Sequence, residues 1–198
     1  MKKVLPPKAI LIPDNAKVAF DGVLFQVYVW PQKMFDGTTE QFEMIRRKDT
    51  VQIMGIKDDK IVMVKDAQPG RAVRTHFPGG RADAKDPDWL AAAKREMREE
   101  TGLEFANWRL IRVTQPWPKA EWFVPWFVAW DVSHEGEQDV DTSGEQIDVE
   151  LWTMEKLKEE VFVKEDPTLA YSIPFLMNAE TIDDILNIPE FKGQEVER

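Results

Sequence analysis

The chain has 198 residues, of which 43% are hydrophobic and 31% are charged, a composition that supports one well-packed domain with at most a small appended lobe. Its formal net charge of -10 argues against a nucleic acid polymer as partner, because phosphates would be repelled over most of the surface. The sequence contains no cysteine, which excludes disulfide bridges, thiolate zinc sites and thiol nucleophiles.

The two ends of the sequence carry little apolar character. Residues 1–18 contain two lysines at the start and a brief apolar run that prolines interrupt. This run is shorter than the apolar core of a secretory signal or a membrane span. We therefore expect a cytoplasmic protein without a membrane partner. The polar residues 192–198 are expected to form a frayed end.

Strand patterns dominate the first third of the chain. Apolar residues alternate over residues 17–30 on both sides of an Asp21-Gly22 turn, which predicts a β-hairpin. Residues 41–56 predict two more strands, and the polar turn at 58–60 leads into another at 61–67. Residues 68–88 are rich in Gly, Pro and Arg, and predict a loop with one short strand near 74–77.

The most clearly delimited helix is expected from about Asp88 to Thr101. Asp86 or Asp88 can cap its start, and Gly102 can end it. Further elements are expected as strands at 107–114, 121–132 and 146–152, a helix at 154–162, and one or two short helices within 166–188. Mixed strands with two main helices predict an α/β sandwich on a mixed sheet, and the irregular order does not suit a Rossmann unit.

Three glutamates crowd one face of this helix, in the stretch "KREMREETGL" of residues 94–103. Glu96 faces both Glu99 and Glu100 across one turn, and each like-charge pair costs roughly 0.2–0.5 kcal/mol. Arg95 precedes Glu99 by four residues, but Glu96 and Glu100 have no basic residue four positions away. Either the face is solvated and screened, or a hard divalent cation such as Mg²⁺ or Mn²⁺ removes the repulsion.

A glycine pair precedes the helix in "FPGGR", where Gly79 and Gly80 allow the backbone to approach an ion or a phosphate closely. Together with the helix, this stretch resembles the signature of the Nudix hydrolases. The second half of that signature is matched at seven positions: Arg95, Glu96, Met97, Glu99, Glu100, Gly102 and Leu103. The first half departs from the family pattern, because Asp86 stands where a glutamate is expected and lies nine residues before Arg95 instead of eight.

The resemblance implies a Nudix-type α/β/α sandwich on a mixed β-sheet with a small N-terminal β lobe. Residues 1–48 would form the lobe, which resembles the dimerisation and substrate-binding lobe of ADP-ribose pyrophosphatases, and residues 49–198 would form the Nudix domain with C-terminal helices. The implied activity is metal-dependent hydrolysis of a pyrophosphate bond in a nucleoside diphosphate linked to another moiety, with ADP-ribose or an ADP-sugar first. The implied partners are a small nucleotide substrate and a second copy of the chain.

The resemblance also implies roles for particular residues. Glu96 and Glu100 would bind Mg²⁺ or Mn²⁺, with Glu99 as a further or shared ligand that Arg95 orients and the Gly79 carbonyl as backbone ligand. The catalytic base would be Glu145, which matches the family position in "SGEQIDVELW". A plain solvated loop acid is the alternative reading of Glu145, and Asp139 and Asp141 are rivals for the role of base.

Substrate contacts are expected from arginines, glycines and aromatic residues. Guanidinium groups match phosphate oxygens, and Arg71 and Arg81 flank the glycine loop, although a surface salt bridge is the alternative for each arginine. The residues expected to contact substrate are Arg71, Arg81, Arg47, Trp117 and Gly80. Trp122, Trp126 and Trp130 share one face of a strand and either pack in the core or stack a base, and Pro125 predicts an edge strand or a bulge there.

Two other functions stay open on the sequence. The aromatic segment 115–130 departs from what is expected of an ADP-ribose enzyme, which leaves dinucleoside polyphosphates or noncanonical nucleotides as substrates. A non-catalytic Nudix-fold ligand sensor is the third reading, against which the intact second half of the signature argues.

Overall fold

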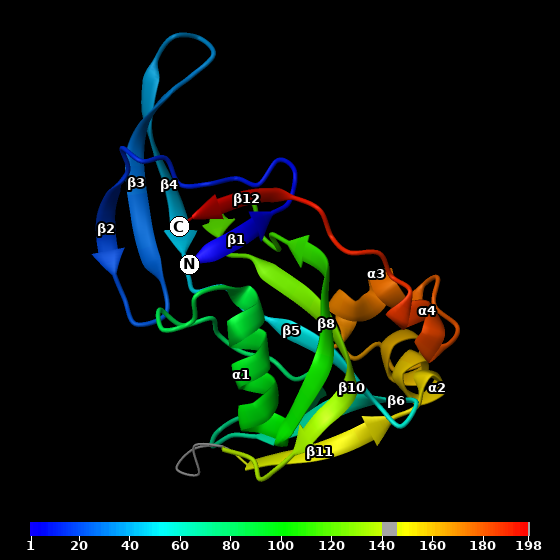
Figure 1. Cartoon of the computed structure of the whole chain (residues 1–198). Coiled ribbons are helices and arrows are strands. Elements are labelled where there is room, and N and C mark those ends of the chain that lie inside the picture. Colours follow the sequence, from blue (N-terminus) through cyan, green and yellow to red (C-terminus); the bar gives the residue numbers. More distant parts are fainter. Residues whose placement is uncertain (140–145, 198) are drawn as a thin grey trace.

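A computed structural model of the chain describes residues 1–139 and 146–197 (Figure 1). Its main sheet has six strands in the order β11-β6-β5-β10-β8, with β7 paired to β6. These strands are β5 (Gln52–Lys57), β6 (Lys60–Ala67), β7 (Arg74–His76), β8 (Leu103–Thr114), β10 (Val124–Glu135) and β11 (Gln146–Trp152). The pair β5 and β10 is parallel and the other pairs are antiparallel, so the predicted mixed sheet is confirmed.

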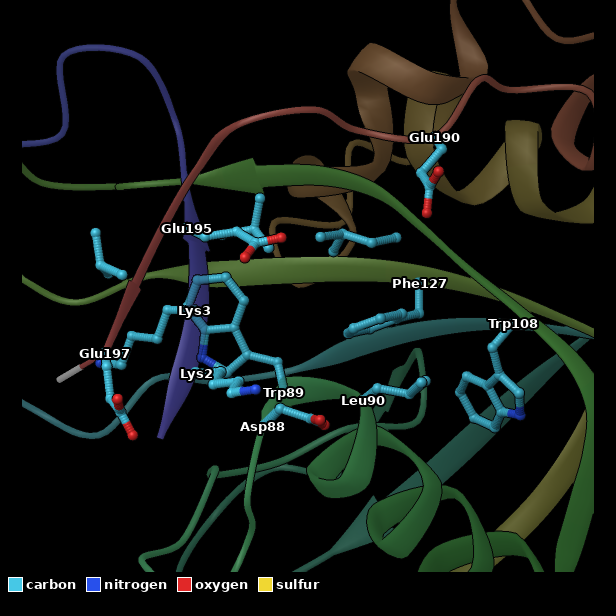
Figure 2. A pocket seen from close by; sticks show the side chains of 13 residues that line it. Lys2, Lys3, Asp88, Trp89, Leu90, Trp108, Phe127, Glu190, Glu195 and Glu197 are labelled. Carbon is cyan, nitrogen blue, oxygen red and sulfur yellow. The ribbon is translucent and has the colours of Figure 1, made fainter.

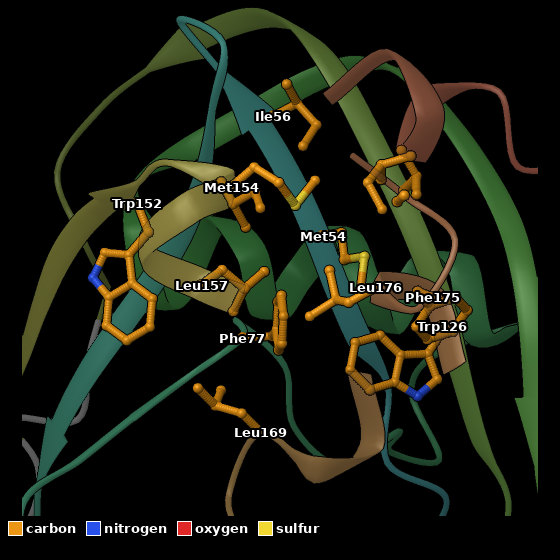
Figure 3. Close-up of a cluster of buried hydrophobic side chains, with 14 of the residues drawn as sticks. Met54, Ile56, Phe77, Trp126, Trp152, Met154, Leu157, Leu169, Phe175 and Leu176 are labelled. Carbon is orange, nitrogen blue, oxygen red and sulfur yellow. The ribbon is translucent and has the colours of Figure 1, made fainter. Parts of the chain in front are cut away.

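Alternating side chains of the sheet build two cores, one on each face. Met54 and Ile56 of β5 belong to the first core, whereas Ile53 on the same strand belongs to the second. The second core contains the buried face of α1 (Trp89–Thr101). The first contains residues of α2 (Met154–Lys158), a π-helical turn (Glu159–Val163), α3 (Ile173–Leu176) and α4 (Ile182–Leu186), together with Leu169, which precedes a 3₁₀ turn (Ala170–Ser172) (Figure 3). Helices cover both faces, as the expected α/β/α sandwich requires.

The N-terminal lobe is a separate four-stranded sheet beside the main one (Figure 1). It consists of β2 (Lys17–Asp21), β3 (Gln26–Lys33), β4 (Thr39–Arg46) and β9 (Ala120–Glu121). Strands β2 and β3 form the hairpin predicted around Asp21-Gly22. Because β9 comes from the later part of the chain and pairs with β4, the two sheets are linked at this point, and the boundary at residue 48 stays a prediction.

The two ends of the chain pair with one another. Strand β1 (Lys2–Leu5) runs antiparallel to β12 (Gln194–Glu197), so the expectation that this tail frays is wrong for residues 194–197. The reason is burial: Leu5 is 2% exposed in the second core, and Val196 packs against the same core. The two four-residue strands lie at opposite ends of the sequence, so no local pattern predicts their pairing.

Helix α1 follows the sequence closely. Of the two proposed caps, Asp88 is the one used, and its side chain accepts a hydrogen bond from the Ala91 N–H at 2.8 Å. Gly102 ends the helix in the left-handed conformation with φ 71°. Ala93 and Met97 are fully buried, which fixes the orientation of the helix and turns the glutamates away from the core.

The aromatic strand differs from the prediction. Residues 121–132 were expected to be one strand, but β9 ends at Glu121 and β10 begins at Val124. Strand β10 lies between β5 and β8, so the edge position predicted from Pro125 is wrong, whereas a register shift between Trp126 and Phe127 places the alternative, a bulge, next to that proline. Trp122, Trp126 and Trp130 were expected either to pack in the core or to stack a base. Trp126 belongs to the first core, and the other two pack against it.

Across residues 1–139 and 146–197, none of the helices has both the length and the apolar character needed to cross a bilayer.

Candidate active site

The glycine pair receives two of the helix glutamates. The Gly79 N–H donates a hydrogen bond to Oε2 of Glu100 at 2.8 Å. A Cβ added to Gly80 would lie 2.4 Å from Oε2 of Glu96, so the space that a side chain would fill is taken by that carboxylate. Glu96 and Glu100 are one helical turn apart, and the loop therefore gathers both carboxylates at one dipeptide.

The backbone on either side of Gly79 is hydrogen-bonded to β5 and to the residue just before it. The Ile53 N–H donates to the Pro78 carbonyl, and the Val51 N–H donates to the Gly80 carbonyl, both at 2.9 Å. Because these bonds use the carbonyls before and after Gly79, the extended chain directs the Gly79 carbonyl away from β5. Gly79 has φ 153° and an added Cβ would lie 2.1 Å from the Val51 carbonyl oxygen, so only glycine fits.

Arg95 connects the carboxylates to the loop. Its Nη1 donates to Glu96 and to Glu99, each at 2.8 Å, and its Nη2 donates to the Arg81 carbonyl at 2.9 Å. It also holds Asp86, through Nε at 3.2 Å and Nη2 at 2.9 Å. Glu96 has no basic residue four positions away, and from this we expected it to lack a cation on its own helix; that expectation is wrong, because the neighbouring Arg95 supplies one.

The electrostatics of the cluster differ between its acids. Burial raises the pKa of Glu96, and the nearby charge and hydrogen bonds of Arg95 only partly counter it. The Arg95 guanidinium lowers the pKa of Asp86, while Asp86 in turn raises the pKa of Arg95. Glu96 therefore carries its negative charge in an unfavourable environment, which an additional cation would relieve.

A second group of cations lies between the lobe and the glycine loop. The Arg47 guanidinium stacks 4.3 Å from the centre of the Trp122 ring, and burial followed by the charge of Arg81 lowers the pKa of Arg47. Arg47, Lys48 and Arg81 line a small cavity of about 60 Å³. Arg47 and Lys48 also line a larger neighbouring cavity of about 940 Å³, which lies within the size range of small-molecule sites.

Comparison with known proteins identifies the family. Residues 46–171 match the NUDIX domain family. The chain belongs to the Nudix family. It is accordingly a Nudix pyrophosphohydrolase, as its signature residues indicated. The crystal structure of an ADP compounds hydrolase shares the fold, with a TM-score of 0.65, 20% sequence identity, and coverage of 86% of this chain and 94% of that chain. No curated protein sequence matches the chain.

The carboxylates of Glu96, Glu99 and Glu100 are donors of the kind that hard divalent cations prefer. Within the residues that the structure describes, no three acidic or histidine side chains are grouped closely enough to enclose a metal ion. Mg²⁺ does not require such a cage, because it is commonly bound by one or two carboxylates together with water and substrate phosphates. The carboxylates of Glu96 and Glu100 meet at the Gly79-Gly80 loop and offer hard oxygen donors of this kind.

The loop expected to carry the base begins beside the Nudix helix. The Asp139 N–H donates to the Glu99 carbonyl at 3.0 Å, and the side chain of Gln138 donates to the Glu100 carbonyl. Asp139, one of the proposed rivals, is therefore held at the last turn of α1. Glu145 and Asp141 lie outside the described residues, and the role proposed for Glu145 stays a prediction.

The remaining predicted contacts are not gathered at the glycine loop. Arg71 lies in an exposed turn after β6, where its N–H donates to the Gln68 carbonyl at 3.1 Å. Trp117 is 50% exposed in the connection between β8 and β9, near the lobe. The structure thus unites Arg47, Arg81 and Gly80 around the site, whereas Arg71 and Trp117 occupy exposed turns.

Asp49, which no sequence pattern singled out, is 4% exposed between the lobe and the main sheet. Its carboxylate accepts hydrogen bonds from Trp89 Nε1 and the Phe123 N–H, both at 2.9 Å, and pairs with Lys3 Nζ at 2.8 Å. Its carbonyl accepts from the Ala82 N–H at 2.9 Å. Asp49 thereby joins the start of α1 to the end of the glycine loop, but in the sequence it looked like an ordinary acid between two strands.

Proposed function

We propose that this Nudix protein hydrolyses a pyrophosphate bond in a nucleoside diphosphate linked to another moiety, and that ADP-ribose or an ADP-sugar is its first substrate. The observation that supports the proposal most directly is the meeting of Glu96 and Glu100 at the Gly79-Gly80 loop. The fold shared with an ADP compounds hydrolase is consistent with this substrate class.

Mg²⁺ or Mn²⁺ is the proposed cofactor, held by Glu96, Glu100 and the Gly79 carbonyl, with Glu99 as a further or shared ligand. When bound, such an ion neutralises pyrophosphate oxygens and lowers the pKa of a coordinated water. The chain's own contribution is orientation. Arg95 fixes the carboxylates of Glu96 and Glu99 through one nitrogen, and the Gly79 N–H fixes that of Glu100.

Substrate phosphates would be drawn to the arginines beside the site. Arg47 and Arg81 repel one another and lie next to the small cavity of about 60 Å³, so an anionic group between them relieves that repulsion. The nucleoside would occupy the adjoining cavity of about 940 Å³ between the lobe and the main sheet. Glu145 is retained as the proposed general base that takes a proton from the attacking water.

A substrate panel tests the proposal. The protein is incubated with Mg²⁺ and, separately, with ADP-ribose, an ADP-sugar, NADH, a diadenosine polyphosphate and nucleoside triphosphates, and products are followed by phosphorus NMR. Turnover of ADP-ribose or the ADP-sugar with release of AMP is expected. Preference for the diadenosine polyphosphate would replace the substrate assignment, and binding without turnover of any member would identify a ligand sensor.

A single charge-removing substitution tests the metal role. Glu100→Gln keeps an oxygen that can accept from the Gly79 N–H but loses the negative charge. We expect turnover to fall by more than about 100-fold, because losing even an outer-shell partner of a metal ligand costs about 10- to 100-fold. Glu104→Gln is the matched control, since this exposed acid follows the helix on β8. Equal turnover of the two variants would contradict the assignment of Glu100.

We also propose that the protein forms a homodimer through its N-terminal lobe and functions in the cytoplasm. All five residues of β2 are exposed, including Val18 at 51% and Phe20 at 60%. Val23 at 99% and Leu24 at 60%, in the turn after β2, are exposed apolar side chains as well. Exposed apolar patches of this kind on an edge strand are typical of protein interfaces.

A further inference from the structure

A third cavity lies under the pair formed by the chain ends. Strands β1 and β12 form one wall, the first turn of α1 forms another, and β8 and β10 form the floor (Figure 2). Its volume is about 580 Å³, within the range of pockets that bind small molecules. The Lys2 N–H donates to the Pro87 carbonyl at 3.0 Å, which attaches β1 to the segment before α1 and closes this side of the cavity.

The floor of this cavity is aromatic. Figure 2 shows Trp89, Phe127 and Trp108 below the C-terminal segment that carries Glu190 and Glu195. Trp108 is only partly buried, and its Nε1 already donates to the Phe105 carbonyl at 3.0 Å. The polar atom of this indole is therefore satisfied within the protein, and what the ring offers to a ligand is apolar and π surface.

The rim of the cavity is acidic. Four carboxylates line it, those of Asp88, Glu190, Glu195 and Glu197, against the ammonium groups of Lys2 and Lys3. Lys3 is already paired with the buried Asp49 at 2.8 Å. The remaining charge favours a cation, and a cation close to an indole ring gains a further electrostatic attraction.

The cavity adjoins the cavity proposed for the nucleoside, because Lys3 and Glu197 line both, but it lies apart from the carboxylates at the glycine loop. None of the residues that line it is a candidate metal, base or phosphate contact. It meets α1 at Asp88, Trp89 and Leu90 in the first turn, whereas Glu96 and Glu100 belong to the second half of the helix. A ligand here would contact the catalytic helix without occupying the space of the pyrophosphate.

We propose that this cavity binds an organic cation with an aromatic body, of the arylalkylamine class. The aromatic floor takes the ring, and the carboxylates of the C-terminal segment take the ammonium group. The proposal does not depend on the hydrolase activity, because binding is measured on the protein alone.

The test compares three probes by isothermal titration calorimetry in low-salt buffer. Phenethylamine has the ring and the positive charge, 3-phenylpropionate has the ring and a negative charge, and spermidine has positive charge without a ring. We expect phenethylamine to bind about 10-fold or more tightly than either of the other two, because only this probe combines apolar burial with charge complementarity. Equal affinity for phenethylamine and 3-phenylpropionate would overturn the proposal.

Variants locate the binding. Glu195→Lys reverses a charge on the rim at an exposed position and is expected to weaken phenethylamine binding about 10-fold, whereas Glu155→Lys, at another exposed position on α2, should leave it unchanged. Trp108→Ala should weaken binding by about 5- to 30-fold through loss of the ring. Calorimetry is repeated with Glu100→Gln, which should bind phenethylamine as the natural protein does. Loss of binding in that variant, or unchanged binding in Glu195→Lys, would refute a site at this cavity.

Discussion

Arg95 holds Asp86 through two hydrogen bonds, from Nε at 3.2 Å and from Nη2 at 2.9 Å. Asp86 is the residue that departs from the Nudix signature: it is shorter than the family's glutamate and lies one position further from Arg95. Asp86 still reaches Arg95 despite the extra residue, because Asp86 lies in the loop before α1, which starts at Trp89. The departure therefore changes the loop, but Arg95, which orients Glu96 and Glu99, still has a carboxylate partner.

The first prediction concerns the stability of this pair. Asp86→Asn should lower the free energy of unfolding by about 1.5–3 kcal/mol, the range for hydrogen bonds to charged groups. Asp83→Asn, in the same loop, removes a more exposed pair with Lys48 and should cost no more than about 1 kcal/mol. Urea unfolding at neutral pH measures both. A similar loss in the two variants would show that the contact between Asp86 and Arg95 has no special weight.

The same pair gives a pH dependence with a defined sign. Arg95 lowers the pKa of Asp86 in the folded protein, so the unfolded chain binds the proton more readily. The stabilisation is fully present above the ordinary value of 3.8 and is lost as the pH falls through the lower folded pKa. Asp86→Asn should therefore make the loss of stability below about pH 4 shallower. The free energy of unfolding, measured from pH 2 to pH 6, tests this. The same pH dependence in the natural protein and in Asp86→Asn would contradict the prediction.

The second prediction uses the two glycines as a matched pair. Gly80→Ala would place Cβ 2.4 Å from the end of the Glu96 side chain, which can move, so activity should fall by about 10-fold or more while stability changes by less than about 1 kcal/mol. Gly79→Ala would place Cβ 2.1 Å from the Val51 carbonyl, and at φ 153° it should lose at least about 1–3 kcal/mol of stability. Thermal unfolding and turnover distinguish the two. Full activity in a folded Gly80→Ala protein would contradict the role given to the position of Glu96.

Much of this arrangement follows from local patterns. Helix α1 has a capping aspartate, a buried stripe and a terminating glycine, and β11 occupies the predicted residues 146–152, because each signal lies within a few neighbouring residues. The β1–β12 pair and the contacts of Asp49 escaped prediction because their partners are distant in sequence. The pairing of Glu96 with Arg95 was missed for another reason: adjacent helix residues do not ordinarily face each other, but a long guanidinium side chain reaches around.

The third prediction concerns the charge of Glu96 and the proposed metal. Burial raises the pKa of this acid, and Glu99 repels it, so Glu96→Gln should raise the stability of the metal-free protein by about 0.5–1 kcal/mol while lowering turnover by more than about 100-fold. Glutamine keeps an oxygen for Arg95. Mg²⁺ or Mn²⁺ should raise the melting temperature of the natural protein more than that of the variant, and EDTA should reverse the shift. An equal metal shift in both proteins would remove Glu96 from the ligand set.

The fourth prediction tests the lobe as a dimer surface. Val18→Lys places a charge on β2, where the side chain is 51% exposed, and should weaken self-association by about 30-fold or more if this strand is central to the interface. Val163→Lys is the control, because Val163 is 75% exposed in the π-helical turn after α2. Sedimentation velocity over a range of concentrations measures both. Equal behaviour of the two variants, or a monomeric natural protein, would count against the proposed interface.

The last prediction concerns Asp49, which links Lys3, Trp89 and the glycine loop. Asp49→Asn leaves the ammonium group of Lys3 without its buried partner and should lower the free energy of unfolding by about 3–5 kcal/mol. The double variant Lys3→Met/Asp49→Asn should recover part of that loss, because it removes the uncompensated charge. No recovery in the double variant would show that the contacts with Trp89 and Phe123 outweigh the ion pair at this position.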